Sequence, residues 1–136
     1  MQFHSFLERI HFFGEDHTYE YNVDDVNNNK VPCIFAYFGI LFFLPLVACR
    51  RSDYGRYHAN QGLLLLLLSI IFGGFCWLLN LGRFVPFFGV ITLILSGIVG
   101  FIGSSCCLSL LVYGIVNIVR GQATDLPIIG WIRIIK

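Results

Sequence analysis

Three long apolar runs without charged residues dominate the chain, and polar stretches separate them. They cover residues 31–49, 61–81 and 84–119. A helix rises about 1.5 Å per residue, so a run of about 20 residues matches a hydrocarbon core about 30 Å thick. The pattern therefore predicts an all-α integral membrane protein with crossings at residues 31–49 and 61–81.

The third run is too long for one straight crossing. As a single helix its 36 residues would be about 54 Å long, and burying that length needs more than the usual tilt limit of about 40°. We expect a break, and the candidate positions are Pro86, Ser96, Gly97, Gly100 and Gly103. This predicts a half-helix or re-entrant piece at residues 85–96 and a crossing at 97–119. Four short crossings are the alternative.

Charged residues are few and unevenly placed. They make up 12% of the chain, about half the usual fraction of a soluble domain. Residues 50–60 carry three Lys/Arg, the residues after 119 carry three, and Arg83 stands alone between them. The positive-inside rule places the first loop and the C-terminus in the cytoplasm. Three crossings satisfy this arrangement, with the N-terminus outside.

The two ends of the chain differ from this membrane domain of residues 31–136. Residues 1–30 form a polar region, in which one helical face predicts an N-terminal amphipathic helix on the membrane surface, or else a disordered tail. That face consists of Phe3, Phe6, Leu7, Ile10 and Phe13. The tail at residues 120–136 is expected to lie at the interface, anchored by Trp131, Arg133 and Lys136, and to cover residues 58–61.

The segment "RYHANQ" places polar side chains directly before six leucines. An unpaired amide at membrane depth costs several kcal/mol, so Asn60 and Gln61 need partners. One hypothesis makes Arg56, His58, Asn60 and Gln61 the contacts for a partner or cargo. The other makes them polar links between helices of the same chain.

Small residues recur at helical spacing in the second and third runs. Such spacing lets two helix backbones approach closely. The positions are Ser69, Gly73, Ser96, Gly100, Gly103 and Ser104. They predict either packing of these two helices within one chain or the seam of a homo-oligomer.

The sequence contains no motif of a known catalytic or cofactor site. It lacks HExxH, GxSxG and a P-loop, and no Asp, Glu, Lys, Arg or His lies deep in a predicted crossing. His4, His11 and His17 do not share a helical face, and the five cysteines form no CxxC pair. A net charge of +1 without a basic patch gives no sign of nucleic-acid binding. We expect no enzyme activity, metal or cofactor.

Two stretches resemble a known family. "NKVPCIFAYFGILFFLPLVACRRSDYGRYHANQGLLLLL" and "RGQATDLPIIGWIRIIK" are similar to a family of small bacterial membrane proteins of unknown function. That family is related to the chloroplast import component Tic-twenty. The matching residues are Ala36, Tyr37, Gly39, Pro45, His58, Ala59, Asn60, Gln61, Gly62, Gly121, Ala123, Leu126, Pro127, Ile129 and Gly130. The resemblance implies a bacterial inner-membrane location and, by analogy with the four-helix chloroplast relatives, a link to protein translocation.

These observations favour a non-catalytic integral membrane subunit. It would act in a translocation, insertion or membrane-organising assembly, surrounded by the lipid bilayer and bound to a membrane protein or to copies of itself. The alternative is a self-assembling homo-oligomeric channel, lined by hydroxyl groups and by the Asn60 and Gln61 amides.

Overall fold

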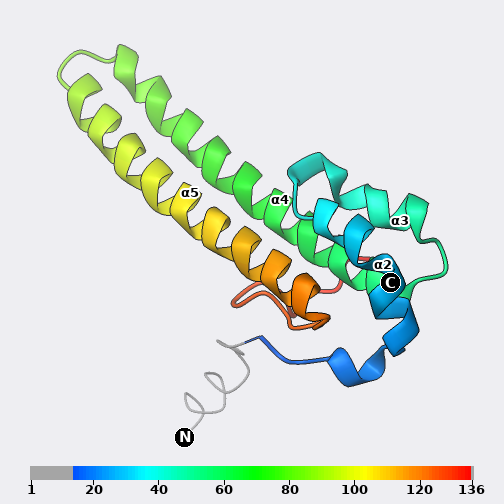
Figure 1. The fold of residues 1–136 in the computed structure, drawn as a ribbon. Coiled ribbons are helices and arrows are strands. Elements are labelled where there is room, and N and C mark those ends of the chain that lie inside the picture. The colour runs from blue at the N-terminus through cyan, green and yellow to red at the C-terminus, as the bar shows by residue number, and fades with distance from the viewer. Residues whose placement is uncertain (1–13, 136) are drawn as a thin grey trace, which may run out of the picture.

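A computed structural model describes residues 14–135 of the chain. Helices make up 74% of the structure, and these residues contain no strand. Two long helices, α4 (Asp53–Leu81) and α5 (Gly89–Arg120), form an antiparallel hairpin. Shorter helices pack against one end of this hairpin, where the C-terminal tail also lies (Figure 1). We call this end the base.

Helix α4 begins at a capped N-terminus. Ser52 accepts a hydrogen bond from the backbone N–H of Gly55 at 2.9 Å, and Asp53 places a negative charge in the first turn. The helix continues through the leucine run and ends at Gly82, where the short helix η3 (Gly82–Phe84) starts the turn into α5.

Helix α5 is continuous, so the predicted break in the third apolar run is wrong. Residues 89–96, placed in a half-helix or re-entrant piece, are the first turns of α5. Pro86 precedes the helix and interrupts no helical hydrogen bond. The glycines at 97, 100 and 103 each cost about 1 kcal/mol relative to alanine, which is too little to break a long helix packed against α4.

Residues 31–49 do not form one crossing helix, which corrects the prediction for the first run. Helix α2 (Val23–Phe35) starts in the polar linker, where Asn22 caps it, and contains Pro32. The chain then turns at Gly39, whose φ of 60° suits glycine, and returns through η2 (Gly39–Phe43) and α3 (Leu44–Ala48). Pro45 lies in the first turn of α3 instead of kinking a long helix.

The N-terminal segment and the C-terminal tail lie side by side. The N–H of His17 donates to Ala123 O at 2.9 Å, and the N–H of Asp125 donates to Glu15 O at 3.0 Å. Asp16 and Thr124 form an isolated bridge. Two segments bonded in this way cannot lie on opposite sides of a membrane, so the prediction that places the N-terminal region opposite the tail is wrong for residues 15–17. The predicted amphipathic helix lies outside the described residues.

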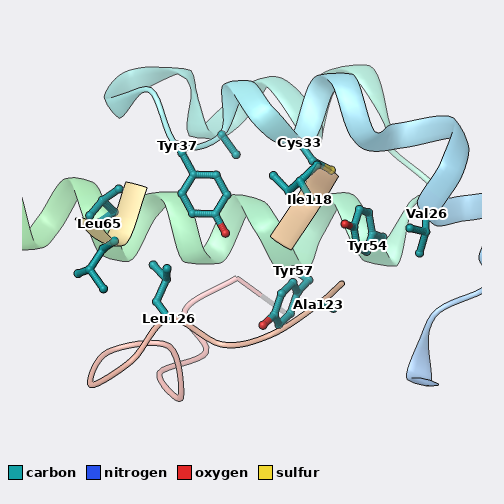
Figure 2. Close-up of a cluster of buried hydrophobic side chains, with 11 residues drawn as sticks. Val26, Cys33, Tyr37, Tyr54, Tyr57, Leu65, Ile118, Ala123 and Leu126 are labelled. Carbon is teal, nitrogen blue, oxygen red and sulfur yellow. The ribbon is translucent and has the colours of Figure 1, made fainter. Parts of the chain in front are cut away.

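The core gathers at the base, where α2, α4, α5 and the tail meet (Figure 2). Its buried residues include Cys33, Tyr37, Tyr54, Tyr57, Ile118 and Leu126. The other half of the α4–α5 hairpin instead exposes large apolar side chains, such as Trp77 at 68% and Phe101 at 74%. Both long helices have the length and apolar composition to cross a membrane.

The small residues singled out above divide into two groups. Gly103 lies against α4, since a Cβ there would come 2.7 Å from the Phe72 ring. Ser96 is buried and donates to Asn80 Oδ1 at 3.4 Å. The others border, together with Gly103, an apolar groove of about 580 Å³ on the side of the hairpin. They are Ser69, Gly73, Gly100 and Ser104.

Candidate functional site

The polar residues of "HANQ" lie at the base and bind the tail. Asn60 donates from Nδ2 to Ile132 O at 2.7 Å. Its Oδ1 accepts from the N–H groups of Ile134 and Ile135 at 2.7 and 2.9 Å. One amide thus satisfies three backbone groups of an irregular segment. The predicted covering of residues 58–61 by the tail is confirmed for Asn60 and for Gln61.

Gln61 also binds the tail, at residues that precede those bound by Asn60. Its Nε2 donates to Gly130 O and to Asp125 Oδ1, both at 3.0 Å, and its Oε1 accepts from Leu126 N–H at 3.3 Å. Both amides are buried. While the tail is bound, therefore, they link parts of one chain, and neither is free to contact a partner or cargo.

Asp125 is the hub of this cluster, and sequence reasoning missed it. Its carboxylate is buried and accepts from Tyr57 Oη at 2.7 Å and from Gln61. An arginine and a histidine lie beside it, since Arg133 Nη2 is 3.7 Å from Oδ1 and His17 Nε2 is 3.3 Å from Oδ2. The only signal was that it is the single acidic residue of the tail. We call Tyr57, Asn60, Gln61 and Asp125 the tail-binding cluster.

His58 is enclosed by aromatic rings. Its Nδ1 is 3.0 Å from the hydroxyl of Tyr37, and its ring packs edge-on against Tyr54 and Tyr57 at centroid distances of 4.5 and 5.0 Å. The side chain is fully buried, and Nε2 has no hydrogen-bond partner among the described residues. Its position gives no access to a substrate from solvent, and its direct polar contact is a phenol.

The remaining predicted contacts lie nearer the surface of the base. Arg56 is half-exposed, with Nη1 3.8 Å from Asp53 and Nη2 donating to Arg50 O at 3.3 Å. Trp131 is exposed and donates to Ile128 O at 2.8 Å. Arg133 lies over the Tyr57 ring at 4.9 Å, so it serves the tail-binding cluster as well as the surface. Lys136 lies outside the described residues.

Within residues 14–135, no three His, Cys, Asp or Glu side chains are grouped to hold a metal ion. The five cysteines are free thiols spread over several elements, and Cys33 and Cys49 are buried. His17 contacts two carboxylates, those of Glu20 and Asp125. His4 and His11 lie outside the described residues.

His17 joins the N-terminal segment to the tail-binding cluster through charge. Its Nδ1 is 2.9 Å from Glu20 Oε1, and its Nε2 is 3.3 Å from Asp125 Oδ2. A carboxylate only accepts hydrogen bonds, so both ring nitrogens must carry protons to satisfy both contacts. Burial lowers the pKa of His17, but the Glu20 hydrogen bond and the Asp125 charge outweigh it, and the net pKa lies above its ordinary value.

This arrangement predicts a pH-dependent stability at the base. Because the folded pKa of His17 is raised, its stabilising effect is complete below about pH 6.5 and is lost as the pH rises through the folded pKa. The melting temperature of the wild type should exceed that of His17→Gln at about pH 6, and the difference should shrink toward about pH 8.5. Thermal unfolding in detergent measures both. A difference that stays constant with pH would contradict a charged His17.

Comparison with known proteins adds no relative, since no family model, curated protein or solved structure matches the chain. The resemblance to the Tic-twenty-like family therefore depends on the two quoted stretches alone. The tail-binding cluster brings those stretches together, because the amides of "HANQ" bind the backbone of "LPIIG" and the residues that follow.

Proposed function

We propose that the chain is a non-catalytic integral membrane subunit of the bacterial inner membrane. Its α4–α5 hairpin crosses the bilayer twice, and its base stays at the cytoplasmic face and binds a protein partner. The observation that carries this is the surface of the hairpin. In the most apolar 18-residue stretch of each long helix, only 17% of α4 and 11% of α5 is buried within the chain. The core helix of a soluble protein is instead mostly buried.

The distribution of charge supports this orientation. The base carries Arg50, Arg51, Arg56, Arg120 and Arg133, and the turn at the other end carries only Arg83. The positive-inside rule counts Lys and Arg, and it places the end that is richer in them in the cytoplasm. Two crossings also keep the N-terminal segment and the tail on one side, as their hydrogen bonds require. A role in translocation, insertion or membrane organisation follows from the Tic-twenty-like resemblance.

The contacts at the base argue against the channel alternative. Its pore would be lined by the Asn60 and Gln61 amides, which the tail occupies. The hydroxyls of Ser69 and Ser104 face a groove, but they donate to Leu66 O and Phe101 O of their own helices at 2.7 and 3.1 Å. Few polar groups are therefore free to replace the water around an ion.

Native mass in mild detergent tests the proposal. The wild-type protein, extracted from its own membranes, should run as a complex that contains a second protein. Asn60→Ala should lose that protein, because the surface of the base is disordered without its tail contacts. Ser69→Ala is the control and should keep it, because it alters an exposed hydroxyl that bonds only to Leu66 O of its own helix and takes no part in the tail-binding cluster. Extraction by alkaline carbonate would contradict membrane insertion. Ion flux in liposomes containing only this chain would favour the channel.

A further inference from the structure

We propose that residues 31–49 form a wedge that inserts into one leaflet of the bilayer and contacts its acyl chains without crossing. We call these residues the half-depth hairpin. The inference rests on the proposed membrane insertion of α4 and α5. The two-crossing topology gives residues 31–49 no position in the membrane, and the wedge assigns them a surface that contacts lipid.

The half-depth hairpin reaches only about halfway along α4. Its turn packs at Gly62, where a Cβ would lie 2.0 Å from Ala36 O, and at Leu66, whose Cδ1 would lie 4.0 Å from a Cβ on Gly39. Leu66 is about 20 Å from the start of α4 and about 22 Å from its end at Leu81. A core about 30 Å thick, measured back from Leu81, begins near residue 61. The turn therefore lies about 8 Å inside it, within one leaflet.

The outer surface of the half-depth hairpin is entirely apolar. Its only side chain with an oxygen or nitrogen is Tyr37, which is buried against His58. Seven large side chains point away from the protein and are 38–72% exposed. They are Val31, Phe35, Phe38, Ile40, Leu41, Phe43 and Val47. Exposure of such a patch to water is unfavourable, whereas in a leaflet it contacts apolar acyl chains.

Four backbone N–H groups around the turn are bonded within the protein, which suits an apolar surrounding. Irregular backbone is tolerated at membrane depth only where its polar groups are satisfied within the protein. The N–H groups of Ala36, Tyr37 and Phe38 donate to carbonyls three residues earlier at 3.1, 3.3 and 3.1 Å. The N–H of Leu41 does the same to Phe38 O at 3.3 Å. Ala36 and Tyr37 are themselves buried.

Charges mark where this apolar surface ends. Lys30 precedes it, and Arg50 and Arg51 follow it, at the same end of the molecule as the base. Such cations are suited to lipid phosphates at the headgroup level. The half-depth hairpin lies beside α4 (Figure 1). Because α4 exposes large apolar side chains from Leu67 onward, the two apolar surfaces adjoin. This continuity favours acyl chains over a protein partner.

Tryptophan depth measurements test the wedge in the full chain. The native tryptophans are replaced by phenylalanine, and Phe38→Trp is introduced as the single probe. In vesicles of phospholipids brominated on their acyl chains, its fluorescence should be quenched, its emission should be blue-shifted, and aqueous iodide should have little effect. Tyr19→Trp in the same background is the aqueous control, because Tyr19 is 83% exposed on the base side. It should respond to iodide and not to bromine.

A second single-tryptophan protein separates the wedge from the proposed function. It retains native Trp77 on α4, which should be quenched by bromine whether or not the wedge exists. Quenching of Trp77 without quenching of Phe38→Trp would overturn the wedge alone, and failure of both would overturn membrane insertion. Tags at the two chain ends complete the test. A protease outside the vesicles should remove both or neither from each molecule, whereas cleavage of one only would mean a full crossing by residues 31–49.

Discussion

Asp125→Ala is expected to release the C-terminal tail and to lower the free energy of unfolding by about 3 kcal/mol. The substitution removes the acceptor of two buried donors, Tyr57 Oη and Gln61 Nε2. A buried donor left without a partner costs about 1–3 kcal/mol. Arg133 and His17 also lose the charge beside them, which adds to the destabilisation.

Thermal or denaturant unfolding in detergent, with proteolysis of a C-terminal tag, measures both effects. Asp53→Ala is the matched control, because the Asp53 side chain is 80% exposed and its ion pair with Arg56 spans 3.8 Å. Exposed pairs of this kind contribute about 0–1 kcal/mol. Equal melting temperatures for the two variants, with the tag protected in both, would show that Asp125 does not organise the tail.

The role of the amides was readable from the sequence because it follows from solvation. Asn60 and Gln61 stand against a leucine run, and buried amides need partners whatever the fold. Which partners they take was not readable in this way, because the tail was expected to cover them only on the ground that both lie on one side of the membrane. Asp125 was not readable in the same way. A single acidic residue in a loop has no periodicity, and only the three-dimensional contacts give it four neighbours from three parts of the chain.

The number and course of the helices were only partly predictable, because the length of an apolar run does not decide whether that run crosses a membrane. Helix α5 stays unbroken although it is about 48 Å long. Its last turns pack in the base, where Ile118 is buried and Gly114 lies against the Tyr37 ring, so they need no hydrocarbon around them. Residues 31–49 have the length to cross but turn back at Gly39. Nothing in their composition distinguishes these two courses.

Close backbone contact at Gly62 was also beyond sequence reasoning. The small-residue pattern drew attention to Gly73 on the same helix, yet a Cβ there would meet no atom within 4 Å. At Gly62 a Cβ would lie 2.0 Å from Ala36 O and 2.7 Å from its carbonyl carbon. These are backbone atoms of the turn that holds the half-depth hairpin, so they cannot move aside as a flexible side chain would.

Gly62→Ala should therefore lower the free energy of unfolding by about 3 kcal/mol, the upper end of the usual range for overpacking. Gly73→Ala, the same chemical change on the same helix, should raise it by up to about 1 kcal/mol because alanine favours the helix. Thermal unfolding of both variants in one detergent measures the opposite signs. Iodide quenching of Phe38→Trp should increase in the Gly62→Ala background and not in Gly73→Ala. A Gly62→Ala protein as stable as wild type would mean that α2 and its turn do not rest on α4.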